Sequence, residues 1–215
     1  MKKITLIVSV ALASLATGCS NVEHSRDVAN PDVSGKVLAQ QVCSMCHGVT
    51  GNSINPTFPK LAGQQKDYMT DQLKFFRGHD RSDPAGSEYM WGITRHLTDK
   101  QIGELADYYA AQKRLPDPSN NVPLEELGKQ IFTKGVSDGD RSVPACETCH
   151  GADAHGRGIF PFIAGQHEDY ILKQLNIFKK TEERDEKVGQ MMKNETHDLS
   201  DEEMKAAAAY IATMP

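Results

Sequence analysis

Apolar residues recur along this chain at the spacing of amphipathic helices. After Gly63, the side chains of Tyr68, Leu73 and Phe76 fall on one helical face. A later stretch places Ile102 and the residues after it in the same way. No segment alternates apolar and polar residues over the length of a strand. The pattern therefore predicts short helices joined by loops, which is an all-α chain.

This pattern occurs twice. Residues 58–64 match residues 160–166, and the two copies then stay in register without a gap as far as the last helix. Each last helix is predicted to begin with a capping box, one at Thr98 and one at Ser200. Two copies in register indicate two similar domains in tandem.

The domain boundaries follow from composition. We expect a first domain over residues 34–113, a linker with three prolines over 114–123, and a second domain over 124–215. The domains are predicted to begin with helices over 34–46 and 124–134. The second copy alone carries an insertion rich in Gly, Asp and Ser, residues 135–144, which we interpret as a loop.

The chain begins with a segment typical of export. Two lysines precede an apolar run that is too short to span a membrane, so residues 1–18 are predicted to be a signal peptide. The run ends in Leu-Ala-Thr-Gly-Cys, which resembles the lipobox of bacterial lipoproteins. This predicts a lipid on Cys19 and a polar tether over 19–33, which would anchor a periplasmic protein to the membrane. Ordinary cleavage near Gly18, with Cys19 incidental, is the alternative.

Composition narrows the class of protein. Hydrophobic residues make up 39% and charged residues 25%, as in a soluble globular protein. The net charge of −5 argues against nucleic acid as a partner. Four of the five cysteines fall in two short motifs, so no disulfide framework is expected.

Those motifs are two copies of Cys-x-x-Cys-His, the attachment sequence for a c-type haem. Two thiols one helical turn apart can bond the porphyrin vinyl groups, and the adjacent imidazole can bind the iron. We therefore predict two covalently attached haem c groups, held by Cys43, Cys46 and His47 and by Cys146, Cys149 and His150. A zinc half-site and a thioredoxin-like dithiol are the alternatives; the first lacks a clean second Cys/His pair and the second lacks a βαβ setting.

A second axial ligand is also indicated. Met90 and Met192 occupy equivalent positions in the repeat, each in what we expect to be an irregular stretch before the last helix. A thioether ligand favours reduced iron and raises the reduction potential. Met191 is equivalent to Tyr89, which makes it the weaker candidate. Bis-histidine ligation is not expected because these histidines do not recur in the repeat: His79, His96, His155 and His197.

Two further pairs recur in the repeat. Pro59 and Pro161 can present a carbonyl or a rigid turn to the haem-binding histidine, and Tyr68 and Tyr170 can place a hydroxyl near a propionate or at the domain interface. Ordinary packing explains each pair equally well.

Together, these motifs resemble cytochrome c4. Each Cys-x-x-Cys-His is followed by Phe-Pro-x-[Leu/Ile]-Ala-Gly-Gln and by Met and then Leu-[Ser/Thr]-Asp, over residues 34–215. The resemblance implies two tandem class I cytochrome c domains related by pseudo-twofold symmetry, each around one covalent haem with His/Met ligation. It implies single-electron transfer in the periplasm, from the quinol–cytochrome c oxidoreductase side towards a terminal oxidase. The lipobox and the insertion 135–144 depart from the family pattern.

The main prediction is an electron carrier, not an enzyme, because no acid–base or nucleophilic group is placed near an open iron. The alternative is a haem subunit of an oxidoreductase or a dihaem peroxidase-like enzyme, which would need a labile iron ligand. A haem-based sensor would also need an output domain.

Overall fold

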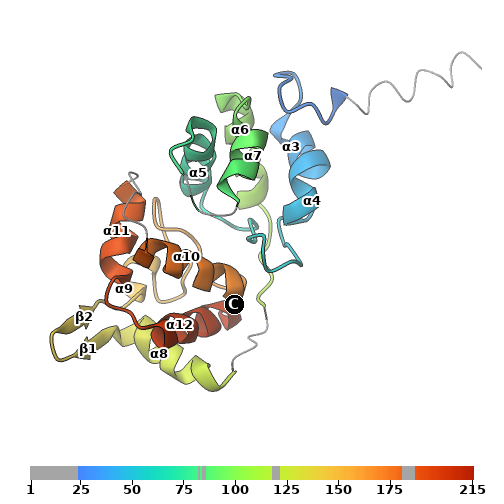
Figure 1. Cartoon of the computed structure of the whole chain (residues 1–215). Coiled ribbons are helices and arrows are strands. Elements are labelled where there is room, and N and C mark those ends of the chain that lie inside the picture. The colour runs from blue at the N-terminus through green and yellow to red at the C-terminus, as the bar shows by residue number, and fades with distance from the viewer. Residues whose placement is uncertain (1–23, 82, 84–85, 118–121, 181–186) are drawn as a thin grey trace, which may run out of the picture.

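The computed structural model describes residues 24–81, 83, 86–117, 122–180 and 187–215. The predicted signal peptide and Cys19 lie outside the described residues. Two helical domains follow one another along the chain and pack side by side, with the C-terminus close to their junction (Figure 1). Within the described residues, no helix is both long and apolar enough to cross a membrane.

In the described part of the first domain, helices are the only regular secondary structure. Its first helix is continuous but changes pitch, because a π-helical turn separates two α-helical turns. The elements, in order, are α3 (Gly35–Leu38), η1 (Ala39–Cys43), α4 (Ser44–His47), α5 (Lys66–Gly78), α6 (Ser87–Thr94) and α7 (Asp99–Ala110).

The second domain repeats this order with one addition. The predicted loop 135–144 is partly wrong, since it contains an antiparallel hairpin in which Val136 pairs with Val143 (Figure 1). The elements are η2 (Val122–Leu124), α8 (Glu125–Lys134), β1 (Val136–Asp138), β2 (Arg141–Val143), α9 (Glu147–His150), α10 (Glu168–Lys180), α11 (Lys187–Thr196) and α12 (Asp201–Thr213).

The last helix of each domain begins as the sequence predicts. Thr98 accepts a hydrogen bond from the backbone of Gln101, whose side chain bonds back to residue 98. Ser200 and Glu203 form the same reciprocal pair. These capping boxes satisfy backbone donors that would otherwise lack partners at the helix start.

Each last helix crosses the first helix of its domain at a glycine. A Cβ at Gly128 of α8 would lie 2.0 Å from the carbonyl oxygen of Ala206 in α12. A Cβ at Gly35 of α3 would lie 2.6 Å from Cβ of Glu104 in α7. Only a residue without a side chain permits these close crossings.

The described part of the expected tether is packed. Residues 24–33 form turns, and Val28 and Val33 pack against the first core. The side chain of Gln101 donates to the carbonyls of Asn30 and Val33. This segment is therefore not a free coil, and a flexible tether would be shorter than the sequence suggests.

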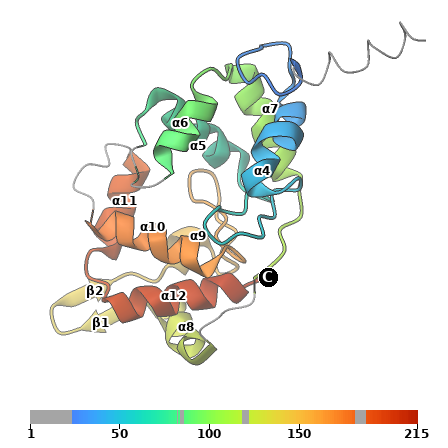
Figure 2. The same ribbon diagram turned by 45° about the vertical axis from the view of Figure 1, so that its right-hand side comes forward.

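The two domains contact each other through polar groups. In Figure 2, α10 lies between α12 and the first domain. The buried Arg81 donates to Gln72 of its own domain and to Gln174 of the other, which are equivalent residues in the repeat. The Arg81 guanidinium is also paired with Asp83, with an Nη2–Oδ2 distance of 2.6 Å. The interface thus carries a charged pair that contacts equivalent residues of both domains.

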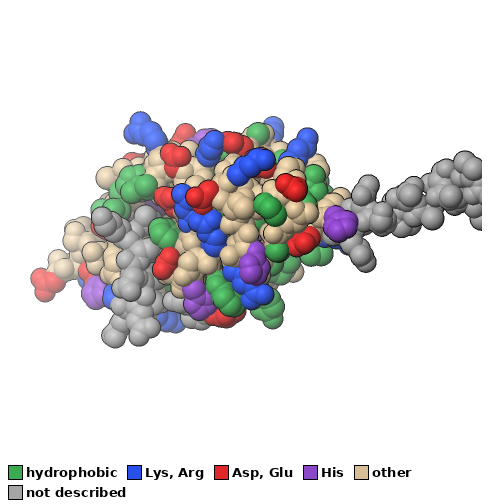
Figure 3. Space-filling model, turned by 90° about the horizontal axis from the view of Figure 1, so that it is seen from above, with side chains coloured by type: hydrophobic (Ala, Val, Ile, Leu, Met, Phe, Trp, Pro, Cys, Tyr) green, Lys and Arg blue, Asp and Glu red, His purple; other side chains and the backbone are tan. Residues whose placement is uncertain are grey.

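The described residues on the face of the molecule seen in Figure 3 carry charges of both signs. Figure 3 shows basic and acidic side chains interspersed, with small apolar groups between them. Such a surface is typical of a solvated face.

Candidate haem sites

Both Cys-x-x-Cys-His motifs form one helical turn, so the two thiols of each motif lie on the same side. Cys43 ends the π-helical turn η1, and Cys46 lies in α4. Cys146 caps α9, and Cys149 lies within it. All four thiols are free, which leaves them available for thioether bonds.

Burial governs the chemistry of the leading thiols. Burial raises the pKa of Cys43 to about 11, although a hydrogen bond with Tyr109 has the opposite, lowering effect. Burial likewise raises the pKa of Cys146 to about 11. A pKa raised in this way leaves the thiol protonated at neutral pH, unlike the low-pKa thiol of a redox dithiol.

The histidine of each motif is buried and held in one orientation. Nδ1 of His47 lies 2.9 Å from the carbonyl oxygen of Pro59, and Nδ1 of His150 lies 3.1 Å from that of Pro161. A carbonyl can only accept, so Nδ1 carries the proton and Nε2 keeps its lone pair. Burial lowers the pKa of both imidazoles, which keeps them neutral as metal ligands must be.

The recurring prolines thus have a clear role. Of the three interpretations that the sequence left open, the carbonyl acceptor holds for both Pro59 and Pro161. Such an acceptor fixes the tautomer of a metal-binding histidine and raises its basicity.

The two candidate methionines occupy equivalent places, but the expectation of an irregular stretch is wrong. Met90 lies in α6 and Met192 lies in α11. The Met90 carbonyl accepts from the buried Thr94 hydroxyl, and the Met192 carbonyl accepts from the equivalent Thr196. Both methionines are half-buried, whereas Met191 is exposed. The expectation failed because short helices with Gly and Thr have a weak periodic pattern.

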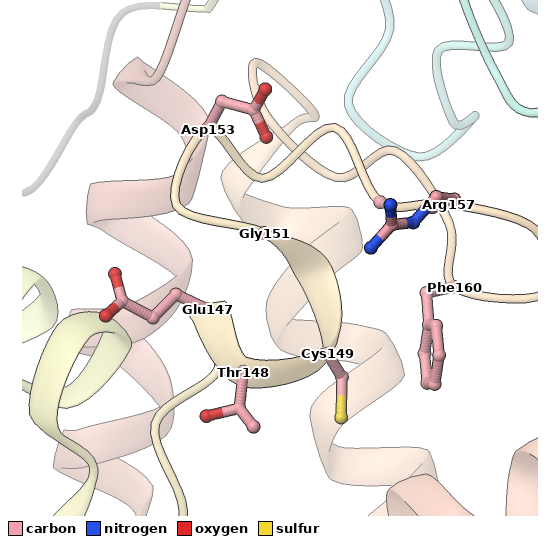
Figure 4. A pocket seen from close by; sticks show the side chains of 8 residues that line it. Glu147, Thr148, Cys149, Gly151, Asp153, Arg157 and Phe160 are labelled. Atoms are coloured by element: carbon pink, nitrogen blue, oxygen red, sulfur yellow. The ribbon is translucent and has the colours of Figure 1, made fainter.

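A surface pocket adjoins the second motif. Its volume is about 500 Å³, and Cys149, Arg157 and Phe160 contribute to its wall. Figure 4 shows the Cys149 sulfur and the Phe160 ring on one side of the α9 turn, while the Glu147 carboxylate points away. His150 is not one of its lining residues, so this pocket is not the space around the histidine ring.

The four histidines that the sequence set aside have other partners. His79 faces Glu88, His155 faces Asp153 and Pro215, His197 faces Asp198, and His96 accepts from Arg95. Within the described part of the chain, no three His, Cys, Asp or Glu side chains gather as a metal-ion site. The zinc alternative therefore has no support there.

The donor set of each motif suits a covalently held haem: two free thiols on one side of a turn and a neutral imidazole with Nε2 unprotonated. A family model described as cytochrome c matches residues 33–111 and again residues 125–215. The chain belongs to the cytochrome c family. The repeat seen in the sequence is thus a repeat of whole cytochrome c domains.

Relatives narrow the family further. Cytochrome c-552 of Acidithiobacillus ferridurans is 37% identical over 195 residues, which are 89% of this chain and 82% of that protein. Cytochrome c4 of Thiocapsa roseopersicina is 34% identical over 181 residues, 83% of this chain and 90% of that protein. The predicted resemblance to cytochrome c4, a family of dihaem electron-transfer proteins, is confirmed.

Matches to solved structures support the same family. Reduced recombinant cytochrome c4 from Pseudomonas stutzeri matches with a TM-score of 0.73 at 30% identity, over 84% of this chain and 97% of that one. Thiosulfate dehydrogenase (TsdBA) from Marichromatium purpuratum matches with the same TM-score and identity, over 84% of this chain but 40% of that one. The predicted fold of two cytochrome c domains is confirmed, and with it two covalently bound haem c groups.

One polar cluster at the domain junction escaped the sequence analysis. Lys60 is 3% exposed, and its Nζ lies 3.2 Å from Asp117 Oδ1 and donates to the carbonyls of Leu115 and Gly165. Asp117 Oδ2 lies 2.5 Å from Nδ1 of His167. Residues 114–117 of the predicted linker are therefore packed between the domains. The sequence carries no signal for this cluster because its members are far apart and do not recur in the repeat.

Proposed function

We propose that this cytochrome c4 carries single electrons between respiratory partners in the periplasm. Its donor would lie on the quinol–cytochrome c oxidoreductase side, and its acceptor would be a terminal oxidase. The observation that supports electron transfer best is the matched environment of His47 and His150. Both imidazoles are buried, neutral and hydrogen-bonded to a proline carbonyl. This likeness suits two redox centres better than one redox centre and one catalytic site.

His47 with Met90 and His150 with Met192 would hold the two haem irons, and Cys43, Cys46, Cys146 and Cys149 would hold the porphyrins through thioether bonds. A bound haem supplies a one-electron ferric/ferrous couple. The proline carbonyls hold the imidazoles in the orientation that would present Nε2 to the iron, and the methionine sulfurs would favour its reduced state. Because each iron would be held by two residues of the chain, it would offer no open position to a substrate.

Membrane attachment belongs to this proposal. The lipobox at residues 15–19 and the odd cysteine, Cys19, support a lipid anchor at the mature N-terminus. Such an anchor would keep the carrier beside membrane-bound donors and acceptors.

The ligand set is tested with Met192→Leu and with Met191→Leu as a neighbouring control. The oxidised wild type should show a thioether-to-ferric-iron charge-transfer band in the near infrared, and the reduced wild type little carbon monoxide binding. Met192→Leu should lose about half of the band and bind about one carbon monoxide per chain, because one haem of two loses its sixth ligand. Met191→Leu should resemble the wild type. Rapid carbon monoxide binding by the wild type would contradict the proposal and favour an enzyme.

A second function is a haem subunit of an oxidoreductase. It is favoured by the match to the thiosulfate dehydrogenase TsdBA, of which this chain covers 40%. A protein named thiosulfate dehydrogenase electron acceptor, from Thiomonas intermedia, is also 31% identical over 180 residues. Stable co-purification with a dehydrogenase subunit would support this function over that of a free carrier.

A further inference from the structure

Two buried glutamines clamp the backbone of the opposite domain. Gln166 Nε2 donates to the Lys60 carbonyl at 2.9 Å, and its Oε1 accepts from the Lys60 amide at 2.8 Å. Gln64 Nε2 donates to the Phe162 carbonyl at 3.0 Å, and its Oε1 accepts from the Phe162 amide at 2.8 Å. Gln64 and Gln166 are equivalent in the repeat, so each domain gives and receives one clamp.

Each clamp ends on the same peptide group that holds a haem-binding histidine. The peptide between Pro59 and Lys60 accepts from His47 Nδ1 through its oxygen and donates to Gln166 through its N–H. The peptide between residues 161 and 162 accepts from His150 and donates to Gln64 in the same way. One planar amide thus separates each histidine from a glutamine of the other domain.

Such an amide transmits polarisation. Its nitrogen, carbon and oxygen are conjugated, so an acceptor at the N–H increases the negative charge on the oxygen. A more negative oxygen is a stronger acceptor for Nδ1–H and makes the imidazole more basic. A more basic axial ligand favours ferric over ferrous iron, which lowers the reduction potential.

We propose that Gln166 and Gln64 are positioning residues that each lower the reduction potential of the haem in the opposite domain, through the amide that binds its axial histidine. The inference rests on the proposed ligation by His47 and His150. The reduction potential of each haem would then depend on the contact between the two domains. The oxygens of Gln166 and Gln64 also accept the amides of His167 and Gln65, which fixes their orientation.

The test uses Gln166→Leu and Gln64→Leu in the full haem-loaded chain. A redox titration followed by NMR of the paramagnetically shifted haem methyl signals resolves the two potentials. Gln166→Leu should raise the potential of the first-domain haem, and Gln64→Leu that of the second-domain haem. This crossed response separates tuning from simple loosening, which would affect the haem of the altered domain or both haems equally.

The control is Gln65→Ala. Gln65 follows Gln64 in sequence and donates across the interface to the His155 carbonyl at 2.9 Å, but it does not bond either proline peptide. Its loss removes one hydrogen bond between the domains and should leave both potentials unchanged.

Three results would overturn the inference: unchanged potentials, shifts confined to the altered domain, or an equal response to Gln65→Ala. Should the leucine variants not fold, Gln166→Glu and Gln64→Glu keep an acceptor for the amide, and a rise in the opposite potential would then contradict the inference. Failure of the proposed ligation looks different, because the wild type would then lack the thioether band. If the wild type shows the thioether band and the glutamine variants leave both reduction potentials unchanged, the ligation stands and only the role of the glutamines is contradicted.

Discussion

At the scale of single residues, side chains at equivalent positions of the repeat make different contacts. Lys60 and Phe162 occupy the same place, yet Lys60 buries an ammonium against Asp117, whereas Phe162 lies under the Arg114 guanidinium, 4.1 Å from the ring centroid. Burial lowers the pKa of Lys60 against the opposing effect of Asp117. Burial would raise the pKa of Asp117, but the His167 hydrogen bond and the Lys60 charge outweigh it and hold that pKa below its usual value.

Asp117→Asn should lower the free energy of unfolding at pH 7 by about 2 kcal/mol, because it removes a charged partner from a buried lysine. The pKa of Asp117 is depressed in the folded state, so its contribution is present above the unfolded value of 3.8 and is lost as pH falls below it. Denaturant melts at several pH values should therefore show the gap between variant and wild type narrowing below pH 3.8. Asp107→Asn, which breaks the exposed pair with Lys66, is the control and should cost under about 1 kcal/mol. An equal cost for both variants would contradict this account.

The chemistry of a residue was predictable where it depends on neighbours close to it in the sequence. The spacing of each motif predicts the turn that aligns Cys43 with Cys46. The recurrence of Pro59 and Pro161 indicated a carbonyl acceptor as one alternative beside a rigid turn and ordinary packing. The pairing of Lys60 with Asp117 and His167 was not predictable, because it depends on how two domains and a linker pack.

At the scale of elements, the close crossing at Gly128 sets how α8 meets α12. Gly128→Ala should lower the free energy of unfolding by about 3 kcal/mol, since the new methyl would meet the backbone of Ala206. Gly103→Ala is a matched control within α7, where a Cβ would have no atom within 4 Å. It should leave stability unchanged or raise it by up to about 1 kcal/mol, because alanine is the better helix former. Similar losses in both variants, measured by thermal unfolding, would rule out a steric cause.

The sequence predicts elements best where the signal is strong. Both capping boxes were predicted, because Thr98 and Ser200 precede well-patterned helices. The hairpin β1–β2 was not, because its strands are three residues long and carry no sustained alternation. The crossing glycines were also missed, since a glycine inside a helix does not reveal what lies opposite it.

At the scale of the whole molecule, the packed segment 24–33 begins only five residues after Cys19 in the sequence. If Cys19 carries the lipid, the first domain would be held close to the membrane surface. Cys19→Ser should move the exported protein from the membrane fraction to the soluble periplasmic fraction, because the acyl chains supply the binding energy. Fractionation followed by haem staining measures this, with Ser20→Ala as the control. Unchanged membrane association of the serine variant would count against lipidation.

The glutamine clamps have a consequence for the history of such a chain. The glutamines bond only main-chain atoms of residues 60 and 162, so these hydrogen bonds do not depend on the side chains at those two positions. After an internal duplication, one copy was therefore free to keep a lysine and the other a phenylalanine while the halves stayed docked. A symmetric interface can in this way join two domains that carry different charges at equivalent positions.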